Sequence, residues 1–330
     1  MSIPVLTFFN NKGGVGKTSL VYHLSWMFGE LGCRVLAVDL DPQANLTAAF
    51  LDEEKLVEIW EDDATPNTIF RCLQPLLKVG DVLPGRTVPI SSRLHVLPGD
   101  LALSGFEDQL SEQWPKGLGD ANLERPFRVL TAFWRVAQDA AAGCDADLIL
   151  ADVGPHLGAI NRSALIASDY VVIQLAADLY SLTGLRNLGP TLRGWRAGWG
   201  KRLANWTDAS FELPLGNMTP LGYVAKQHGV RLSRPIKAYD RWLNQIPLEY
   251  RRSIHELAVN TAPAIKDDPE CLAMLKHYHS LVPMAQEVRK PMFFLKPADG
   301  AIGAHTAAVQ SAYTDFHALA SKILIGIDWI

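Results

Sequence analysis

Asn11-Lys12-Gly13-Gly14-Val15-Gly16-Lys17-Thr18 is the stretch that decides the fold. It follows an apolar run, Ile3 to Phe9, and it precedes a segment whose apolar residues repeat at helical spacing. A glycine-rich loop between a strand and a helix is the context that phosphate binding requires, because backbone N–H groups and the helix N-terminus both point at the anion. The sequence therefore predicts a nucleotide triphosphate site at this loop.

The residue types of the loop match separate tasks. Its glycines let the backbone bend around phosphate oxygens, Lys17 reaches the β- and γ-phosphates, and Thr18 offers a hydroxyl to Mg²⁺. ATP and Mg²⁺ are therefore the expected cofactors. We expect the nucleotide to contact the whole segment, namely Lys12, Gly13, Gly14, Val15, Gly16, Lys17, Thr18 and Ser19.

A second lysine stands inside the loop, at Lys12, and Asn11 occupies the first position, where the general pattern has glycine. Lys12 is too close to Lys17 for both ammonium groups to serve one phosphate comfortably. We expect Lys12 to act across an interface on a second nucleotide, so that the ATP-bound dimer is the competent state. Lys12 and Lys17 are thus both candidate catalytic residues.

Two further apolar segments end in aspartates. Arg34 to Asp39 reads as a buried strand and continues into Leu40-Asp41-Pro42-Gln43, and residues 147–152 form a similar segment that ends at Asp152. Carboxylates repel one another and the phosphates, so they are expensive to place at such a site without a role. For Asp39 and Asp41, an acidic turn that caps a strand remains the alternative.

With these motifs the chain resembles the ParA/MinD superfamily of deviant Walker A ATPases, and within it the Soj-like partition ATPases of the ParA type. The resemblance covers about the first 255 residues, with strong motifs in the first 160. It implies that Asp41 positions or activates the attacking water, that Asp39 supports the metal region and that Asp152 holds Mg²⁺ through a water. It also implies an adenine contact at Pro247, in a proline-containing loop.

One departure from the family pattern concerns the third motif. ParA-like chains usually carry Asp-x-Pro-Pro there, whereas this chain has Asp152-Val153-Gly154-Pro155. Glycine leaves the backbone of this second switch freer than proline does, so the hydrolysis rate stays open.

The expected fold class is α/β: a doubly wound, mainly parallel sheet with helices on both faces, as in P-loop NTPases of the deviant Walker A type. The 330 residues, 48% of them hydrophobic, predict a single ATPase domain over 1–330. Insertions are expected at about 108–126 and 193–219, and the C-terminal segment 256–330 is atypical of the family. The tryptophans Trp195, Trp199 and Trp206 are expected to pack against the sheet, with a partner surface as the alternative.

Cysteine spacing and hydropathy exclude several classes of protein. The four cysteines include no Cys-x-x-Cys pair, which argues against zinc, disulfides and an iron-sulfur cluster. No apolar run is long enough to span a membrane, and the tail Phe316–Ile330 has Lys322 as its one basic residue, so we expect no membrane partner. The expected location is the cytoplasm, at the nucleoid if DNA is the target.

Basic residues are unevenly spread along a chain whose net charge is −4. Five lie between residues 186 and 202 with no acid, and seven lie between 226 and 252 against two acids. If the fold joins these windows, an ATP-bound dimer would present a sequence-tolerant, salt-sensitive DNA surface, whereas a merely solvated face is the alternative. The residues that we expect to contact DNA are Arg231, Arg234, Lys237, Arg241, Arg251 and Arg252.

The motifs and the resemblance together predict a slow Mg²⁺-dependent ATPase that forms a homodimer with ATP and binds DNA without sequence preference. Hydrolysis, stimulated by a ParB-like or other protein activator, would time release during segregation or positioning of DNA or another cargo. One alternative is an ATP-switched regulator of a protein partner in a polarity, secretion or defence system. A less favoured alternative is a metabolic ATP-dependent enzyme of the same superfamily.

Overall fold

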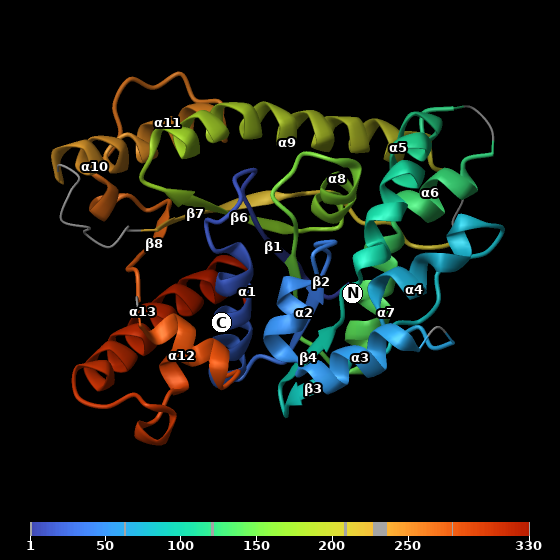
Figure 1. Cartoon of the computed structure of the whole chain (residues 1–330). Coiled ribbons are helices and arrows are strands. Elements are labelled where there is room, and N and C mark those ends of the chain that lie inside the picture. The colour runs from blue at the N-terminus through green and yellow to red at the C-terminus, as the bar shows by residue number, and fades with distance from the viewer. Residues whose placement is uncertain are drawn as a thin grey trace.

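An eight-stranded sheet forms the centre of the protein in a computed structural model, with the strand order β3-β4-β2-β5-β1-β6-β7-β8 (Figure 1). The structure describes residues 2–62, 64–119, 122–207, 210–226, 236–278 and 280–329, without the side chains of 236–239. All neighbouring strands are parallel except β3 and β4. The strands are β1 (Val5–Phe9), β2 (Val35–Asp39), β3 (Val88–Ser91), β4 (Leu94–Leu97), β5 (Leu148–Asp152), β6 (Tyr170–Ala176), β7 (Thr219–Lys226) and β8 (Cys271–Leu275).

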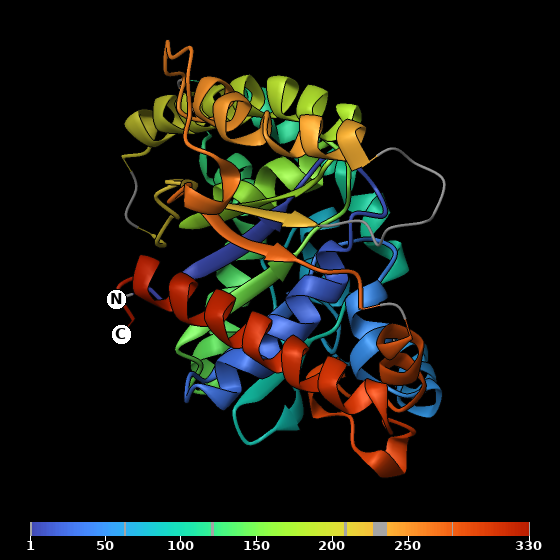
Figure 2. The ribbon, with the colours of Figure 1, turned by 90° about the vertical axis from the view of Figure 1, so that its left-hand side faces the viewer.

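Helices cover both faces of the sheet, which confirms the predicted fold class (Figure 2). Because side chains alternate along each strand, Phe9 and Val38 enter one core while Phe8 and Ala37 enter the other. The first core is covered by α4 (Ile69–Leu73), α5 (Glu107–Lys116), α6 (Glu124–Leu130), α7 (Ala132–Gly143), α8 (Ala159–Ile166), α9 (Leu179–Asn205), α10 (Ile236–Leu243) and α11 (Ile246–Ser253). The second is covered by α1 (Lys17–Glu30), α2 (Asn45–Phe50), α3 (Glu53–Glu61), α12 (Leu281–Glu287) and α13 (Ala304–Gly326).

The predicted insertion at 193–219 contains the second half of the long helix α9, which crosses one face of the sheet (Figure 1). Trp199 is fully buried and its indole N–H donates to Pro214 O at 2.9 Å. Trp206 packs against Phe127, with ring centroids 4.6 Å apart. Packing, rather than a free partner surface, is therefore confirmed for these two tryptophans.

The C-terminal segment adds a strand and a helical layer to the same sheet. β8 pairs with β7 in parallel, and α13 lies against α1 on one side of the sheet (Figure 2). Side chains of α13 also hold the residues that follow β8, because Tyr278 donates to Asp315 at 2.8 Å and Lys276 donates to Ser311 at 3.1 Å. Within the described ranges, no helix has the combined length and apolarity needed to cross a bilayer.

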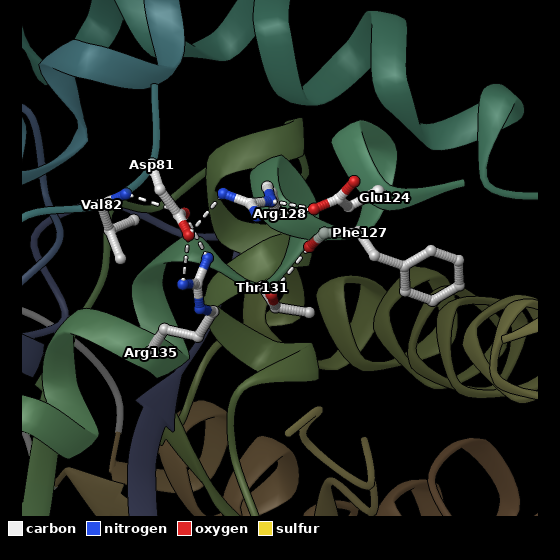
Figure 3. Close-up of polar contacts among 7 residues, drawn as sticks. All are labelled: Asp81, Val82, Glu124, Phe127, Arg128, Thr131 and Arg135. Carbon is white, nitrogen blue, oxygen red and sulfur yellow. Dashed lines mark hydrogen bonds and ion pairs between the residues drawn. The ribbon is translucent and has the colours of Figure 1, made fainter. Parts of the chain in front are cut away.

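A charged cluster fixes the loop before β3 to the helical layer (Figure 3). Arg135 of α7 donates to both carboxylate oxygens of Asp81, at 2.5 and 2.7 Å, and Arg128 of α6 approaches the same carboxylate at 2.7 Å. The guanidinium of Arg135 also lies 4.7 Å from the ring centroid of Phe211. Burial opposes ionisation of Asp81, but the hydrogen bonds from Arg135 and Val82 N and the charges of Arg135 and Arg128 together lower the pKa of this carboxyl.

We expect Asp81→Asn to lower the free energy of unfolding by about 1–3 kcal/mol at pH 7, because one of the paired charges is lost while both guanidiniums stay partly buried. Urea denaturation measures this difference. The lowered pKa means that the contribution is present at neutral pH and is lost as the pH falls through the folded-state pKa, so the two proteins should converge in acid.

Glu124→Gln is the matched control, because Glu124 makes an exposed ion pair with the same Arg128 one turn away. Such a pair contributes less than about 0.5 kcal/mol. Equal losses of unfolding free energy in the two variants would contradict a stabilising role of the Asp81 cluster.

Candidate nucleotide and metal site

The glycine-rich loop turns between β1 and α1 at the carboxyl edge of the sheet. Gly14 and Gly16 have φ values of 72° and 92°, in the left-handed region that glycine adopts without strain. The buried Asn10 supports the turn, because its side chain accepts from Lys12 N at 2.9 Å and donates to Gln174 O at 2.5 Å. The predicted phosphate loop is thus shaped by glycine conformations and anchored from the neighbouring strand β6.

Lys17 begins α1 and is buried at the base of the loop. Its ammonium donates to Asn10 O at 3.1 Å. Burial lowers the pKa of this ammonium, and the charges of Asp152 and Asp41 oppose that effect. An incoming phosphate would add the negative charge that favours the ammonium form.

Asp39 and Asp152 stand side by side, because they end the paired strands β2 and β5 in matching register. The carboxylate of Asp39 is fully engaged: one oxygen accepts from Thr47 N and Oγ1 at 2.9 and 2.7 Å, and the other from Asp41 N at 3.2 Å. Among the described residues, neither carboxylate oxygen of Asp152 has a hydrogen-bond partner. Burial, followed by the charge of Asp39, raises the pKa of Asp152, and burial raises that of Asp39.

These observations fit a magnesium site better at Asp152 than at Asp39. Asp152 is a buried carboxylate whose two oxygens have no partner among the described residues, and it lies close enough to Thr18 for that side chain to favour its charged form. Together they are a donor set that Mg²⁺ and its waters can use. Asp39 instead holds the start of α2, so its predicted support of the metal region is proposed to be indirect. No group of three or more His, Cys, Asp or Glu side chains suited to a metal occurs in the described ranges.

We expect Asp152→Asn to stabilise the nucleotide-free protein at pH 8, by about 1–3 kcal/mol, because it removes a buried carboxylate without hydrogen bonds. The folded-state pKa is raised, so the stabilising effect of the protonated form is present at low pH and is lost as the pH rises from about 4 through about 8. Thermal unfolding in EDTA across this range should show a falling wild-type curve and a flatter variant curve. Superimposable curves would contradict this account.

Asp41 follows β2 and lies at the other side of the loop, largely buried. Its Oδ1 accepts from Gln43 N at 3.0 Å. The segment after β5, residues 153–158, passes beside it and contacts the phosphate loop, since a Cβ on Gly13 would lie 3.7 Å from Pro155 Cγ. The residues expected to bind phosphate, metal and attacking water therefore meet at one edge of the sheet.

Two cavities flank the N-terminus of α1. The larger, of about 640 Å³, is lined by the phosphate loop, Asp41, Pro155 and residues of α2 and α12. The smaller, of about 70 Å³, lies toward the ends of β6, β7 and β8. It is lined by Gln174, Lys226 and residues 276–278, which the sequence prediction missed.

The structure places Pro247, the predicted adenine contact, away from both cavities. It lies buried in the first turn of α11, a helix that packs on α9, and it lines neither cavity. The geometry instead favours the smaller cavity for the nucleoside. Lys226 is a half-buried lysine there whose pKa is lowered by burial, and Gln174 is buried with an amide oxygen that has no partner among the described residues.

Lys12 lies outside both cavities. Its ammonium forms an ion pair with Asp178 at 2.5 Å and lies 5.7 Å from the ring centroid of Tyr180. Burial would raise the pKa of Asp178, but the hydrogen bond from Lys12 lowers it overall. The structure therefore places Lys12 away from its own nucleotide site, at the partly exposed start of α9.

The basic windows are largely engaged in holding the fold together. Arg186 pairs with Glu249, and three other arginines of α9 donate to backbone carbonyls: Arg193 to Ser253, Arg196 to Met218 and Arg202 to Trp114. These contacts remove most of the window at 186–202 from a free basic surface.

The six residues predicted to contact DNA differ in their structural surroundings. Arg231, Arg234 and the side chain of Lys237 lie outside the described residues. Arg251 forms an ion pair at 2.5 Å with the fully buried carboxylate of Asp268, so the structure gives it a structural role and does not support its assignment to DNA. Arg241 and Arg252 are exposed, and Arg252 also donates to Val259 O at 2.7 Å.

Comparisons with known proteins agree with this site. The AAA domain family model AAA_31 matches residues 3–203. The chain is 32% identical over 189 residues to the sporulation initiation inhibitor protein Soj of Bacillus subtilis, covering 57% of this chain and 64% of that protein. It is 31% identical over 194 residues to the chromosome-partitioning ATPase Soj of Thermus thermophilus, covering 59% and 63%. The match thus spans less than two thirds of either relative.

Solved structures support the fold over nearly the whole chain. Protein DIP2308 of Corynebacterium diphtheriae superposes with a TM-score of 0.72 at 25% identity, covering 98% of both chains. The ParA of pNOB8 superposes with a TM-score of 0.61 at 21% identity, also over 98% of both, and at that identity it shows the fold alone.

The phosphate loop, the three aspartates at the strand ends and the order of the strands agree with the match to the family model. The chain belongs to the AAA domain family AAA_31, and it is similar to the Soj proteins, which are members of the ParA/MinD superfamily.

Proposed function

We propose that this protein is a Mg²⁺-dependent ATPase whose ATP-bound homodimer binds DNA without sequence preference and is released by slow hydrolysis. The observation that carries the ATPase is the buried, unpartnered carboxylate of Asp152 beside Lys17 at the phosphate loop. Buried titratable groups with perturbed pKa values and no hydrogen-bond partner are concentrated at sites that a ligand completes.

The residues divide the work of binding. Backbone N–H groups of residues 13–16 and the ammonium of Lys17 would hold the phosphates, with Thr18 and Asp152 on the metal side. When bound, Mg²⁺ would supply positive charge that offsets the charge of the phosphates. Gln174 and Lys226, in the smaller cavity, would face the nucleoside. Asp41 would orient the attacking water and accept its proton.

The homodimer is supported by the position of Lys12. This lysine belongs to the loop, yet its side chain is 35% exposed and its ammonium lies beyond both cavities, where it pairs with Asp178. We propose that closure of two ATP-bound copies transfers this ammonium from Asp178 to the partner's phosphates. A bound phosphate is the stronger attraction because it carries more negative charge.

DNA binding is supported by Arg241 and Arg252, which are exposed, although Arg252 also donates to Val259 O. Two copies in one dimer would double their number, and phosphate contacts would weaken with salt. We propose a ParB-like or other protein activator of hydrolysis, and a cytoplasmic location at the nucleoid. Segregation or positioning of DNA is then the process served.

A protein target is the alternative, but the structure weakens its motivation, because Trp199 is buried and Trp206 packs on Phe127. A metabolic enzyme lacks a supporting cluster of acids, thiols or imidazoles in the described ranges.

Fluorescence anisotropy of a random-sequence DNA duplex tests the proposal, with no nucleotide, with ADP and with ATP, each in Mg²⁺. Binding that needs ATP and weakens steeply between 50 and about 200 mM salt is expected. Equal binding in all three states, or none in any, would overturn the DNA-bound ATP dimer. ATP hydrolysis by the same preparation reports on the ATPase separately.

A further inference from the structure

We propose, resting on the ATPase function above, that His156 is a positioning residue of the hydrolytic site, whose Nε2–H orients Asp41 and the attacking water. His156 lies in the segment after β5, residues 153–158, between the buried Gly154 and the start of α8. Its side chain is exposed next to Pro155, which lines the larger cavity, and nothing in the catalytic scheme above uses it.

The backbone around His156 is held in place from two helices. The amide of Asn161, one turn into α8, donates to Gly154 O at 2.7 Å and to His156 O at 2.5 Å. Glu107 of α5 accepts from Ala159 N at 2.5 Å and from Ile160 N at 2.8 Å. This segment therefore has a defined path, and the imidazole starts from a fixed backbone.

A hydrogen bond selects the tautomer of the imidazole. Gly158 N donates to His156 Nδ1 at 3.3 Å, so Nδ1 is the acceptor and the proton of the neutral ring resides on Nε2. Glu107 Oε1 also lies on this side of the ring. A Cβ on Gly158 would be 2.7 Å from Glu107 Oε1 and 3.0 Å from His156 Nδ1, so both atoms border the same position. The Nε2–H faces the opposite way and remains a free donor.

The lack of a side chain at Gly154 leaves an open space that both this donor and Asp41 border. A Cβ on Gly154 would lie 3.0 Å from His156 Nε2 and 3.4 Å from Asp41 Oδ1, so both atoms border the same small space. A larger residue at 154 would fill the space and separate imidazole from carboxylate. The glycine that departs from the family pattern and the histidine two residues later thus form one arrangement.

The chemistry assigned to this pair is in-line hydrolysis. The water oxygen bonds to the γ-phosphorus, and the bond from that phosphorus to the β–γ bridging oxygen breaks, leaving its electron pair on ADP. The water proton passes to the Asp41 carboxylate and then to the released phosphate. His156 keeps its Nε2 proton throughout, and its hydrogen bond fixes which Asp41 lone pair faces the water.

Substitution of His156 by glutamine or by asparagine distinguishes a role of Nε2 from a role of Nδ1. The amide nitrogen of Gln reaches about as far as Nε2, whereas Asn offers an acceptor near the position of Nδ1 and no donor beyond it. We expect His156→Asn to lower kcat about 10- to 100-fold with KM for Mg-ATP within about twofold, and His156→Gln to stay within about threefold of wild type. A role in loop structure alone predicts the reverse order, and that result would overturn the proposal.

A double-mutant cycle with Gly154→Ala gives the second readout. The added methyl should lower kcat in the wild type and have little further effect in His156→Asn, because the contact that it blocks is already lost. Fully additive effects would overturn the proposal. Wild-type protein without any Mg-ATP hydrolysis would defeat the proposed ATPase itself, whereas normal hydrolysis in His156→Asn would defeat this inference alone.

Discussion

Replacing Lys17 by alanine is expected to lower kcat for Mg-ATP by at least about 10²–10³-fold, the loss seen when a positioned electrostatic group is removed from a reacting centre. Lys17 is buried, and its ammonium lies between the charges of Asp41 and Asp152. Without it, the phosphate would approach two carboxylates with no ammonium from the loop to offset their charge. Phosphate release at saturating Mg-ATP measures the loss, and binding of a fluorescent ATP analogue should weaken in parallel.

Lys55→Ala is the control, because Lys55 is an exposed lysine of α3 that pairs with Glu58 and lies outside both cavities. Its turnover should equal that of the wild type. Wild-type turnover in Lys17→Ala would show that the phosphate loop is not the site of hydrolysis.

Lys12→Ala is expected to leave the protein monomeric in Mg-ATP, under conditions where the intact loop gives a dimer. The comparison is sharpest in an Asp41→Ala background, where hydrolysis no longer depletes the ATP-bound state. The reason is that Lys12, at the surface of the loop, is the group proposed to reach the second nucleotide. Light scattering after size-exclusion chromatography measures the mass in each nucleotide state.

Asp178→Asn is the complementary variant, with the opposite expected effect on dimer formation. It removes the negative charge that holds Lys12 within its own chain at 2.5 Å, so the dimer should form at lower ATP concentration. A dimer of undiminished affinity in Lys12→Ala would mean that Lys12 acts only within its own chain.

The phosphate loop and its surroundings could be predicted from the sequence because each part is local. A strand, a glycine turn and a helix define the position of Lys17, and the strands that end at Asp39 and Asp152 are continuous apolar runs. Parallel strands bring their carboxyl ends to one edge, so the meeting of these residues follows from the fold class.

Other features depend on contacts that are distant in sequence. β8 reads Cys-Leu-Ala-Met-Leu, without the β-branched residues that mark a strand, so residues 276–278 could not be placed at the smaller cavity. Arg251 looked free in sequence, but Asp268 lies opposite it in the fold. The two cavities do not support the Pro247 assignment, for the same reason: a loop motif gives no information about which edge of the sheet it reaches.

On the proposed function, the cap that Glu107 places on α8 would join the lifetime of the ATP-bound state to the folding stability of α5. Most of α5 lies within the insertion predicted at about 108–126. Arg202 of α9 packs on Trp114 of α5, with its guanidinium 3.5 Å from the ring centroid. Substitutions that loosen α5 would therefore alter turnover from a distance. Selection for a more stable α5 would therefore also change the rate of ATP hydrolysis.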